Sequence, residues 1–478
     1  MRVNPELDLD PLFYPRSIAV IGATPRKGKS WDSGNSYIAA SIEQSFQGKI
    51  FPVHPKADTI LGYKAYASVL DIPDEIDLAI FTISNKAVLK VMEECVVKRV
   101  KFAHLLTAGF TETGRPENAE LERELVRIAR KGTIRIVGPN CMGLYTPEGG
   151  LAFNEGFPVQ PGSVSFFSQS GQLASHFVHE GHSHQGLTYS KVVSFGNASD
   201  LQAHEFLDYF LRDEKTKIIG SYLEGMKHGR IFFETAKRVT RKKPLVIWKG
   251  GQTEGGSRAT QSHTAALAGS IEIWQAMCRQ AGIIQVHSMT EAIATVAALK
   301  RMTLPKGVRV AIMGGAGGGS VTMTDMAEKN GLKVPHLSEK TIKALEEIVP
   351  VAGNSVKNPL DVFFEKDEHF NTLIQLLRED PHIDAFIYNM RFGGPNRFQG
   401  ITALNRSIQN TIEASKALGK PMLIVLELTG EPETDMLNTQ IASSLHASNV
   451  ATFPTFEIAA RVIASLKAYH DYLKNFSV

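Results

Sequence analysis

Short apolar runs, rich in β-branched and aromatic residues, recur along the chain and alternate with stretches in which apolar positions have helical spacing. The runs are SIAVIGA, IDLAIFTI, VSFFSQSG, KIIGSYLEG, PLVIWKGG, RVAIMGG and DAFIYNM. This alternation of buried strand and amphipathic helix is typical of βαβ units, which build parallel sheets. Parallel sheets bind ligands at the carboxyl ends of their strands, so we expect the chemistry in the residues that follow each run.

Two stretches break this alternation and predict domain boundaries. Proline and glycine accumulate over residues 145–163, and periodicity fails again over residues 299–309. We therefore predict three α/β domains, over residues 1–147, 148–302 and 303–478. The segments that begin at His287 and Phe453 both run from a strand through a short turn into an Ala-rich helix, which predicts that the second and third domains are related folds.

Composition excludes several classes of protein. The 478 residues are 43% hydrophobic and 21% charged, which is typical of a globular protein of several domains. No apolar run reaches the ~18 residues of a membrane-spanning helix, and the N-terminal segment carries acids where a secretory signal needs a basic start. A net charge of +3 is too small for binding to nucleic acid through phosphate neutralisation. We expect a cytoplasmic protein that binds neither membrane nor nucleic acid.

Metal ligands are also sparse. The three cysteines lie far apart, which fits a reducing compartment and no zinc cage. Four histidines crowd residues 176–184, but their spacing fits no single helical face, and no set of acids or cysteines lies near them. We therefore predict a solvated helix end rather than a metal site.

The first glycine turn, at Gly22, follows a predicted strand and precedes a helix that we expect from about Ser36. This is the setting in which helix N-terminal amides bind phosphate. The loop is one residue too long for a Walker A motif. The second strand ends in His54 and Lys56, where an NAD site would have an acid. A cation at that place suits the phosphorylated ribose of NADP or coenzyme A. A purely structural glycine turn is the alternative.

Three segments of the second domain form a candidate phosphohistidine site if they converge. Residues 253–270 predict a glycine loop, then His263, then an Ala-rich helix. The amides and hydroxyls of residues 168–171 follow a strand and begin a helix, so they can receive a phosphoryl group. Glu224 follows another strand, where a carboxylate can hold an imidazole in the tautomer needed for attack. Spacing alone does not exclude three unrelated loops.

Several motifs resemble one family. FTISN, HLLTAGF and GPNCMG resemble the CoA-binding domain of succinyl-CoA synthetase and of the ADP-forming acyl-CoA synthetases. SHTAALAG resembles the phosphohistidine-loop signature of the α subunit of the ADP-forming enzymes, and SQSG, YLEG and VSFGNASD resemble further elements of it. RVAIMGGAGGGS and AGNSVKNPLDV resemble its C-terminal domain. The fold implied is a Rossmann-like CoA-binding domain followed by two flavodoxin-like domains.

The resemblance implies roles for individual residues. His263 is implied as the phosphorylated residue and Glu224 as its partner. The implied phosphate-binding residues are Ser168, Gln169, Ser170 and Gly171. The implied coenzyme A contacts are Gly22, Ala23, Thr24, Lys56, Ile83, Ser84, Thr107, Ala108 and Gly109. The implied acyl-substrate contacts are Asn140, Cys141, Asn197 and Asp200.

Three positions depart from the family pattern. Ala265 replaces the usual glycine after the His-Thr pair, and the insert at residues 25–34 is longer than expected. Ser175 stands where the succinate-using relatives carry a tyrosine, so the expected acid is not succinate.

The implied reaction is acyl-CoA + ADP + phosphate ⇌ carboxylic acid + CoA + ATP, through an acyl phosphate and phospho-His263. We find no ATP-grasp module in the three predicted domains, so the resemblance implies a β subunit that carries it, with ATP or ADP and Mg, in an assembly such as α2β2. Two other classes stay open: a CoA-binding subunit without catalysis, and an acyl or carbamoyl transferase on the same scaffold. An NADP reductase is a weaker alternative.

Overall fold

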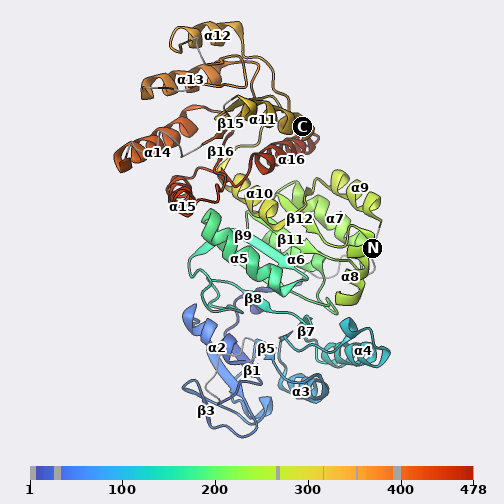
Figure 1. Ribbon diagram of the computed structural model, residues 1–478. Helices are drawn as coiled ribbons and strands as arrows, with labels where there is room; N and C mark the ends of the chain where they lie inside the picture. The colour runs from blue at the N-terminus through green and yellow to red at the C-terminus, as the bar shows by residue number, and fades with distance from the viewer. Residues whose placement is uncertain are drawn as a thin grey trace. The chain divides into compact units, whose positions relative to one another are not determined.

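The computed structural model describes residues 7–25, 34–264, 270–315, 317–350, 354–362, 364, 366–390 and 400–476, without the side chains of 261–264 and 400–403. These residues form two compact units (Figure 1). The first unit is Met1–His182 with Leu187–Met289, and the second is Ser183–Gly186 with Thr290–Val478. Parallel sheets dominate both units, which confirms the predicted α/β fold class.

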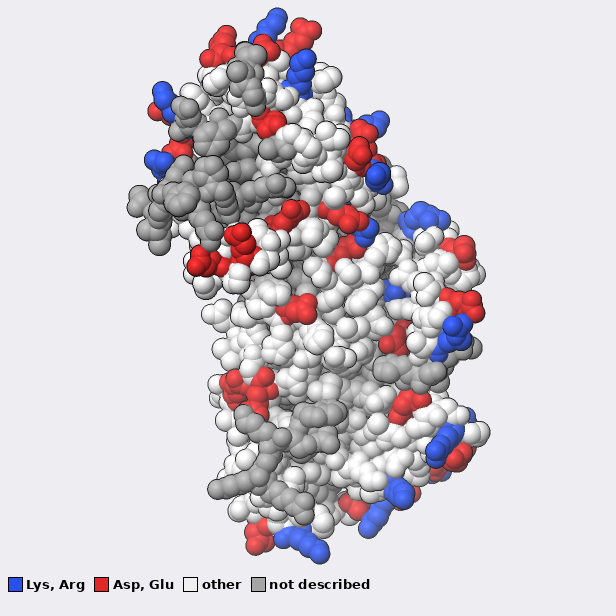
Figure 2. Space-filling model, in the orientation of Figure 1, with Lys and Arg blue, Asp and Glu red and all other residues white. Residues whose placement is uncertain are grey.

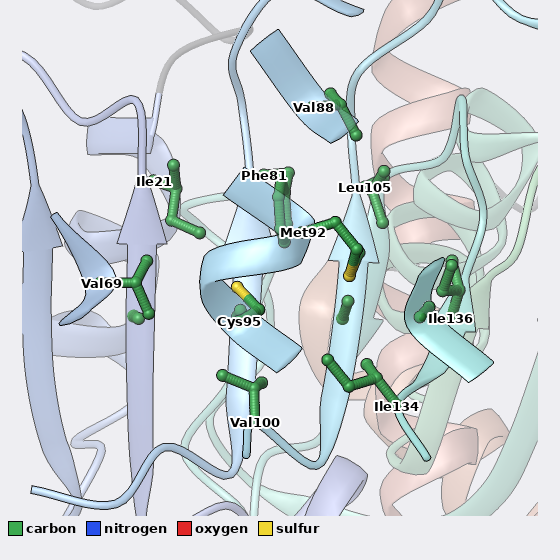
Figure 3. Packing of buried hydrophobic residues seen from close by; sticks show 14 of the residues in the cluster. Ile21, Val69, Phe81, Val88, Met92, Cys95, Val100, Leu105, Ile134 and Ile136 are labelled. Carbon is green, nitrogen blue, oxygen red and sulfur yellow. The ribbon is translucent and has the colours of Figure 1, made fainter. Parts of the chain in front are cut away.

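The first sheet of unit one is wholly parallel, with the order β2-β1-β5-β6-β7. Every residue of β1, β5 and β6 is buried, as expected for strands covered on both faces. Figure 3 shows one side of this core, where Met92 and Cys95 of α3 lie over Phe81 and Leu105. The strands are β1 (Ser17–Ile21), β2 (Lys49–Val53), β5 (Leu78–Phe81), β6 (Phe102–Leu105) and β7 (Arg135–Val137). The helices are α1 (Asp10–Phe13), α2 (Gly34–Glu43), α3 (Asn85–Lys98) and α4 (Pro116–Lys131), with short turns η1 (Val69–Asp71) and η2 (Thr111–Thr113) and the hairpin β3 (Thr59–Ile60) and β4 (Tyr63–Lys64).

The second sheet of unit one has the order β13-β12-β11-β9-β10-β8 and is parallel except for β8. β8 precedes the predicted boundary at residue 147, yet it pairs with β10 of the second sheet. The strands are β8 (Gly143–Tyr145), β9 (Pro161–Ser168), β10 (Tyr189–Ser194), β11 (Ile218–Leu223), β12 (Leu245–Lys249) and β13 (Ile284–Val286). The helices are α5 (Gly171–Gln185), α6 (Ala203–Arg212), α7 (Gly229–Thr240), α8 (Glu254–Thr264) and α9 (Ile271–Ala281).

Unit two contains a parallel sheet with the order β14-β15-β16-β17. The predicted similarity of two segments is confirmed, since β13 leads into α10 and β17 leads into α16, each through a short turn. The main segment of the unit begins at Thr290, ahead of the predicted break at 299–309. The strands are β14 (Val310–Met313), β15 (Ala385–Asn389), β16 (Met422–Val425) and β17 (Thr452–Phe453). The helices are α10 (Met289–Arg301), α11 (Gly318–Lys329), α12 (Glu339–Glu346), α13 (Asp367–Glu379), α14 (Gly400–Ala417), α15 (Pro432–Ala447) and α16 (Phe456–Lys474).

The predicted glycine loop at residue 253 is wrong, because helix α8 begins at Glu254 and includes Gly255 and Gly256. Thr253 explains the early start. Its hydroxyl accepts a hydrogen bond from the N–H of Gly256 at 3.1 Å, so it caps the first turn despite two residues of low helix propensity. The predicted Ala-rich helix after His263 falls on residues 265–269, outside the described residues.

Charge and hydropathy of the described residues agree with the composition. Basic and acidic side chains are interspersed on the face drawn in Figure 2. Among the described helices, none combines the length and the apolar character that crossing a membrane requires.

The ion pairs of Asp77 predict how the stability of the first sheet changes at acidic pH. Its buried carboxylate contacts Arg16 Nε at 3.1 Å and Lys101 Nζ at 2.7 Å. Burial opposes ionisation, but the bonds from Arg16 and Lys101 prevail and lower the pKa of Asp77 to about 2. Since the folded pKa lies below the ordinary value, the ionised carboxylate stabilises the fold above about pH 4, and this stabilisation is lost as the pH falls toward 2. Urea unfolding of Asp77→Asn should show a loss of about 1–2 kcal/mol at pH 7 that vanishes near pH 2. A loss of equal size at both pH values would contradict the assignment.

Candidate functional site

A cleft of about 570 Å³ lies in unit one, where turns from the first and second sheets meet. The turns after β5, β6 and β7 form one side, and the junction of β9 and α5 forms the other. All are carboxyl ends of parallel strands, as the sequence predicts. The lining residues are Thr82, Ile83, Ser84, Asn85, Leu106, Thr107, Ala108, Gly109, Asn140, Cys141, Met142, Gln169, Ser170, Gly171 and Gln172.

Five of the predicted coenzyme A contacts line this cleft: Ile83, Ser84, Thr107, Ala108 and Gly109. Residues 107–109 form a lip on it. Thr107 fastens the lip to the neighbouring turn, because its hydroxyl donates to the carbonyl of Ile83 at 2.8 Å. A wall of small residues and backbone atoms suits a long, thin ligand that passes close to the chain.

The other four predicted coenzyme A contacts follow β1 and β2 and are outside the cleft lining. Gly22 lies directly behind the wall, because a Cβ built on it would stand 2.6 Å from Thr82 Oγ1. Ala23 is buried beside it. Thr24 is joined to α2 by two 2.9 Å bonds with the side chain of Asn35. Lys56 is exposed after β2, and its contact with a phosphate stays a prediction.

Substitution of Gly22 tests whether this turn shapes the cleft. Gly22 has φ +99°, and an alanine Cβ would also stand 2.8 Å from the carbonyl oxygen of Thr82. Gly22→Ala should therefore displace the Thr82 turn and weaken coenzyme A binding by about tenfold, or ~1.4 kcal/mol, in calorimetric titration. Gly62→Ala is the matched control, because Gly62 has φ +86° but nothing within 4 Å of its Cβ position. Equal losses in both variants would contradict a role for the Gly22 contact.

The predicted phosphate-binding residues surround the start of α5. Ser170 and Gly171 line the cleft with the first-turn amides of a helix, which is a favourable place for an anion. Ser168 is fully buried, and its hydroxyl accepts from the N–H of Ser170 at 3.0 Å, so it shapes the turn. A Cβ on Gly171 would stand 2.4 Å from Met142 Cγ, so glycine allows the two walls to approach.

Glu224 lies at the carboxyl end of β11, where Gln169 supports it. The Gln169 side-chain oxygen accepts from the N–H of Glu224 at 2.6 Å and of Gly225 at 3.0 Å. Burial raises the pKa of Tyr222, and the Glu224 carboxylate, which accepts its hydroxyl, raises it further. Burial lowers the pKa of Lys249, and the Glu224 charge opposes that shift. Glu224 is thus a buried residue whose carboxylate accepts the Tyr222 hydroxyl and whose main-chain carbonyl accepts from Lys249 Nζ at 2.7 Å.

The predicted acyl-substrate residues divide into two groups. Asn140 and Cys141 line the cleft. Burial raises the pKa of the Cys141 thiol, so it is protonated at neutral pH. Asn197 and Asp200 are buried outside the cleft lining, and Asn197 is linked to the cleft through Asn140, whose Nδ2 lies 3.4 Å from Asn197 Oδ1.

Asp200 has a full set of protein partners. Its carboxylate pairs with Arg130 and with Arg135 Nε, the latter at 2.9 Å, and accepts from the N–H of Ile136 at 2.8 Å. Its side chain has no exposed surface. The described structure therefore gives Asp200 a role in joining β7 and α4 to the loop after β10.

His263 lies on the described backbone of α8, but its side chain is outside the described residues. Its predicted meeting with Glu224 stays a prediction. At the level of the backbone, α8 follows β12 and lies against η2, the turn that follows the lip.

Sequence reasoning missed some residues of the site. Thr82, Asn85, Leu106, Met142 and Gln172 line the cleft beside predicted residues. The first four lie within the motifs FTISN, HLLTAGF and GPNCMG, and Gln172 directly follows SQSG, so the motifs themselves are the signal that points to them. Lys249 is the last residue of β12 and is buried, which is unusual for lysine and is a second signal.

Models of two protein families match segments of the chain. The family described as CoA binding domain matches residues 16–147, and the family described as succinyl-CoA ligase like flavodoxin domain matches residues 161–299.

Two curated relatives are acetate–CoA ligases by name. The chain is 38% identical to acetate–CoA ligase [ADP-forming] II of Archaeoglobus fulgidus, over 88% of this chain and 61% of that protein. It is 40% identical to the α subunit of acetate–CoA ligase [ADP-forming] II of Pyrococcus furiosus, over 79% of this chain and 81% of that subunit. The chain therefore spans less than two thirds of the first relative and most of the second.

A solved structure is similar over nearly the whole chain. It is the dinucleotide forming acetyl-coenzyme A synthetase 1 of Candidatus Korarchaeum cryptofilum in complex with phosphate and ADP, with 32% identity, a TM-score of 0.82 and coverage of 98% of this chain and 99% of that one. Together with the identity to the Pyrococcus α subunit, this likeness shows that the chain belongs to the ADP-forming acyl-CoA synthetase family, within the succinyl-CoA synthetase-like superfamily.

Proposed function

We propose that this chain is the α subunit of an acid–thiol ligase that interconverts acyl-CoA, ADP and phosphate with a carboxylic acid, CoA and ATP. The observation that carries the proposal is the cleft itself. One side offers small residues and backbone atoms to a thin ligand, and the other offers the N-terminus of α5 to an anion. A thioester and a phosphate are the two substrates that such a cleft can bring together.

In the first step, phosphate attacks the thioester carbonyl, a carbon–oxygen bond forms, and the carbon–sulfur bond breaks to release the CoA thiolate. Ser170, Gly171 and Gln172 place helix N-terminal amides at the cleft, where they would stabilise the charge on phosphate. Asn140 is available in the same wall to orient the acyl oxygen. The product is an acyl phosphate.

In the second step, His263 attacks the phosphorus of the acyl phosphate, and the carboxylate leaves. Neutral imidazole is nucleophilic near pH 7, and its phosphoramidate keeps enough free energy for transfer to ADP. Glu224 would hold the imidazole and stabilise the charge that develops on it. Tyr222 would keep this carboxylate in place through its hydroxyl, and Lys249 would hold the main chain that carries it.

The final step, transfer of the phosphoryl group to ADP, is assigned to a partner subunit with an ATP-grasp module that holds ADP and Mg, in an assembly such as α2β2. The lengths of the relatives support a separate partner. The chain covers 81% of a relative named as an α subunit, but 61% of a relative whose name specifies no subunit. A small acid other than succinate and a cytoplasmic location remain predictions from the sequence.

A single-turnover assay tests this proposal. The chain is mixed with an acyl-CoA, phosphate and ADP, with or without an ATP-grasp partner, and free thiol and ATP are both measured. We expect about one equivalent of thiol and no ATP from the chain alone, and repeated turnover with ATP once the partner is present. ATP formed by the chain alone would contradict the division of labour, and absence of thiol release would favour a CoA-binding subunit without catalysis.

A further inference from the structure

Glu112, on η2, makes three hydrogen bonds that tie the cleft to the loop after β10. Its Oε1 accepts from the N–H groups of Gly109 at 2.5 Å and Phe110 at 3.1 Å. Its Oε2 accepts from Asn197 Nδ2 at 2.6 Å. All three partners are donors, so the arrangement needs a carboxylate, which accepts on both oxygens.

Gly109 is the end of the lip on the cleft. It has φ +99°, and its carbonyl accepts from Asn85 Nδ2 at 2.8 Å. Gly109 is therefore held from two sides, by Asn85 at the start of α3 and by the Glu112 carboxylate, while Thr107 is held separately by the carbonyl of Ile83. A ligand that presses on the lip must act on these supports.

Asn197 extends the support into the second sheet. Its Nδ2 also donates to Glu122 Oε2 at 2.9 Å, and its Oδ1 lies 3.4 Å from Nδ2 of Asn140, which lines the cleft. Glu122 accepts from the N–H of Thr111, so it binds η2 a second time. Lys227 donates to the carbonyl of Asn197 at 3.4 Å. Buried polar networks of this kind are rigid when their members are satisfied.

The turn that bears Glu112 lies against α8, the helix whose backbone carries His263. The lip, η2 and α8 therefore lie in sequence, and the Glu112 carboxylate is the side chain of η2 that bonds back to the lip. A ligand shifts the equilibrium between two conformations only if it binds one of them more tightly. The lip lines the cleft, so a ligand in the cleft can contact it differently in the two conformations.

We propose that Glu112 is a positioning residue that couples occupation of the cleft by coenzyme A to the position of α8. This inference rests on the proposed function, and it adds a route by which binding of the thioester places the helix of the nucleophile. The coupling runs in both directions, so phosphorylation on α8 also changes the affinity of the cleft.

Hydrogen–deuterium exchange of the full chain, with and without saturating coenzyme A, tests the inference. In the unmodified chain we expect coenzyme A to slow exchange of the amides of residues 254–264. In Glu112→Gln, the NH₂ group of the new glutamine faces Nδ2 of Asn197, and two donors cannot form a hydrogen bond. The protection of α8 by coenzyme A should therefore be lost. The dissociation constant for coenzyme A should rise by no more than about threefold. Glu117→Gln, an exposed change in the first turn of α4, is the matched control and should behave as the unmodified chain.

A second variant separates coupling from simple loosening of the cleft. Asn85→Ala removes the other side-chain hydrogen bond to Gly109 but leaves Glu112 in place, so it should weaken binding and still protect α8 at saturating coenzyme A. If Glu112→Gln does not fold, Asn85→Ala still tests the proposal. Loss of α8 protection in Asn85→Ala would overturn the assignment of the coupling to Glu112. Unchanged α8 protection in Glu112→Gln, or no α8 response in an unmodified chain that binds coenzyme A, would also overturn it. Failure of the unmodified chain to bind coenzyme A would overturn the proposed function as well.

Discussion

His263→Ala is expected to abolish net synthesis of ATP from acyl-CoA, with a fall of about 10³-fold or more in the rate measured with the partner present, because no other group takes its place as phosphoryl acceptor. Coenzyme A binding should be unchanged, since the described lining of the cleft is on other segments. A coupled assay for ATP and a calorimetric titration with coenzyme A measure the two quantities on the same preparation.

His184→Ala is the matched control for this prediction. His184 is an exposed histidine near the end of α5, so its loss should leave both the rate and the affinity unchanged. A His263→Ala variant that keeps more than about a tenth of the rate would contradict covalent catalysis at this residue. Loss of coenzyme A binding in that variant would point instead to a structural defect.

Asp200→Ala is expected to cost about 3–5 kcal/mol of folding stability, because it leaves Arg135 largely buried without its main partner. The Arg135 side chain is 15% exposed, and its remaining ion pair with a described residue is the one with Glu205 at 2.8 Å. The N–H of Ile136 also loses its acceptor. Urea denaturation followed by tryptophan fluorescence gives the change in the free energy of unfolding.

The surface carboxylate Asp208 provides the comparison. It pairs with Arg212 and Arg238, whose side chains are 35% and 57% exposed, so Asp208→Ala should cost less than about 1 kcal/mol. The sequence assigns Asp200 to the acyl substrate, whereas its contacts assign it to structure. If Asp200→Ala keeps its stability but raises KM for the acid, the role implied by the sequence is correct and the structural role is wrong.

The strands were predictable from the sequence because their physical signal is local. A fully buried parallel strand such as β5 requires a continuous apolar run, and the run itself shows where the strand ends. The turns that build the cleft follow strands, and the resemblance of HLLTAGF and GPNCMG to the family pointed to Thr107, Gly109 and Asn140, which line it. α8 was not, since its two glycines suggest a loop and only the cap from Thr253 indicates a helix.

The residues that hold the cleft turns in place could not be predicted from the sequence, for a different reason. Glu112 and Asn197 are separated by 85 positions, and Gln169 and Glu224 by 55, so only the tertiary fold brings their polar atoms together. No periodicity or spacing marks such pairs in a single sequence. Motifs therefore point to the turns that line the cleft, while the residues that hold those turns emerge from the hydrogen bonds.

Transfer of ³²P from inorganic phosphate to the isolated chain tests most directly whether His263 is phosphorylated during the reaction. The chain is incubated with acyl-CoA and labelled phosphate, then digested and sequenced by mass spectrometry. We expect an acid-labile, base-stable label on His263. This label should require acyl-CoA and should disappear when an excess of free CoA and carboxylic acid is added. A label on another residue, or no label while thiol is released, would contradict this expectation.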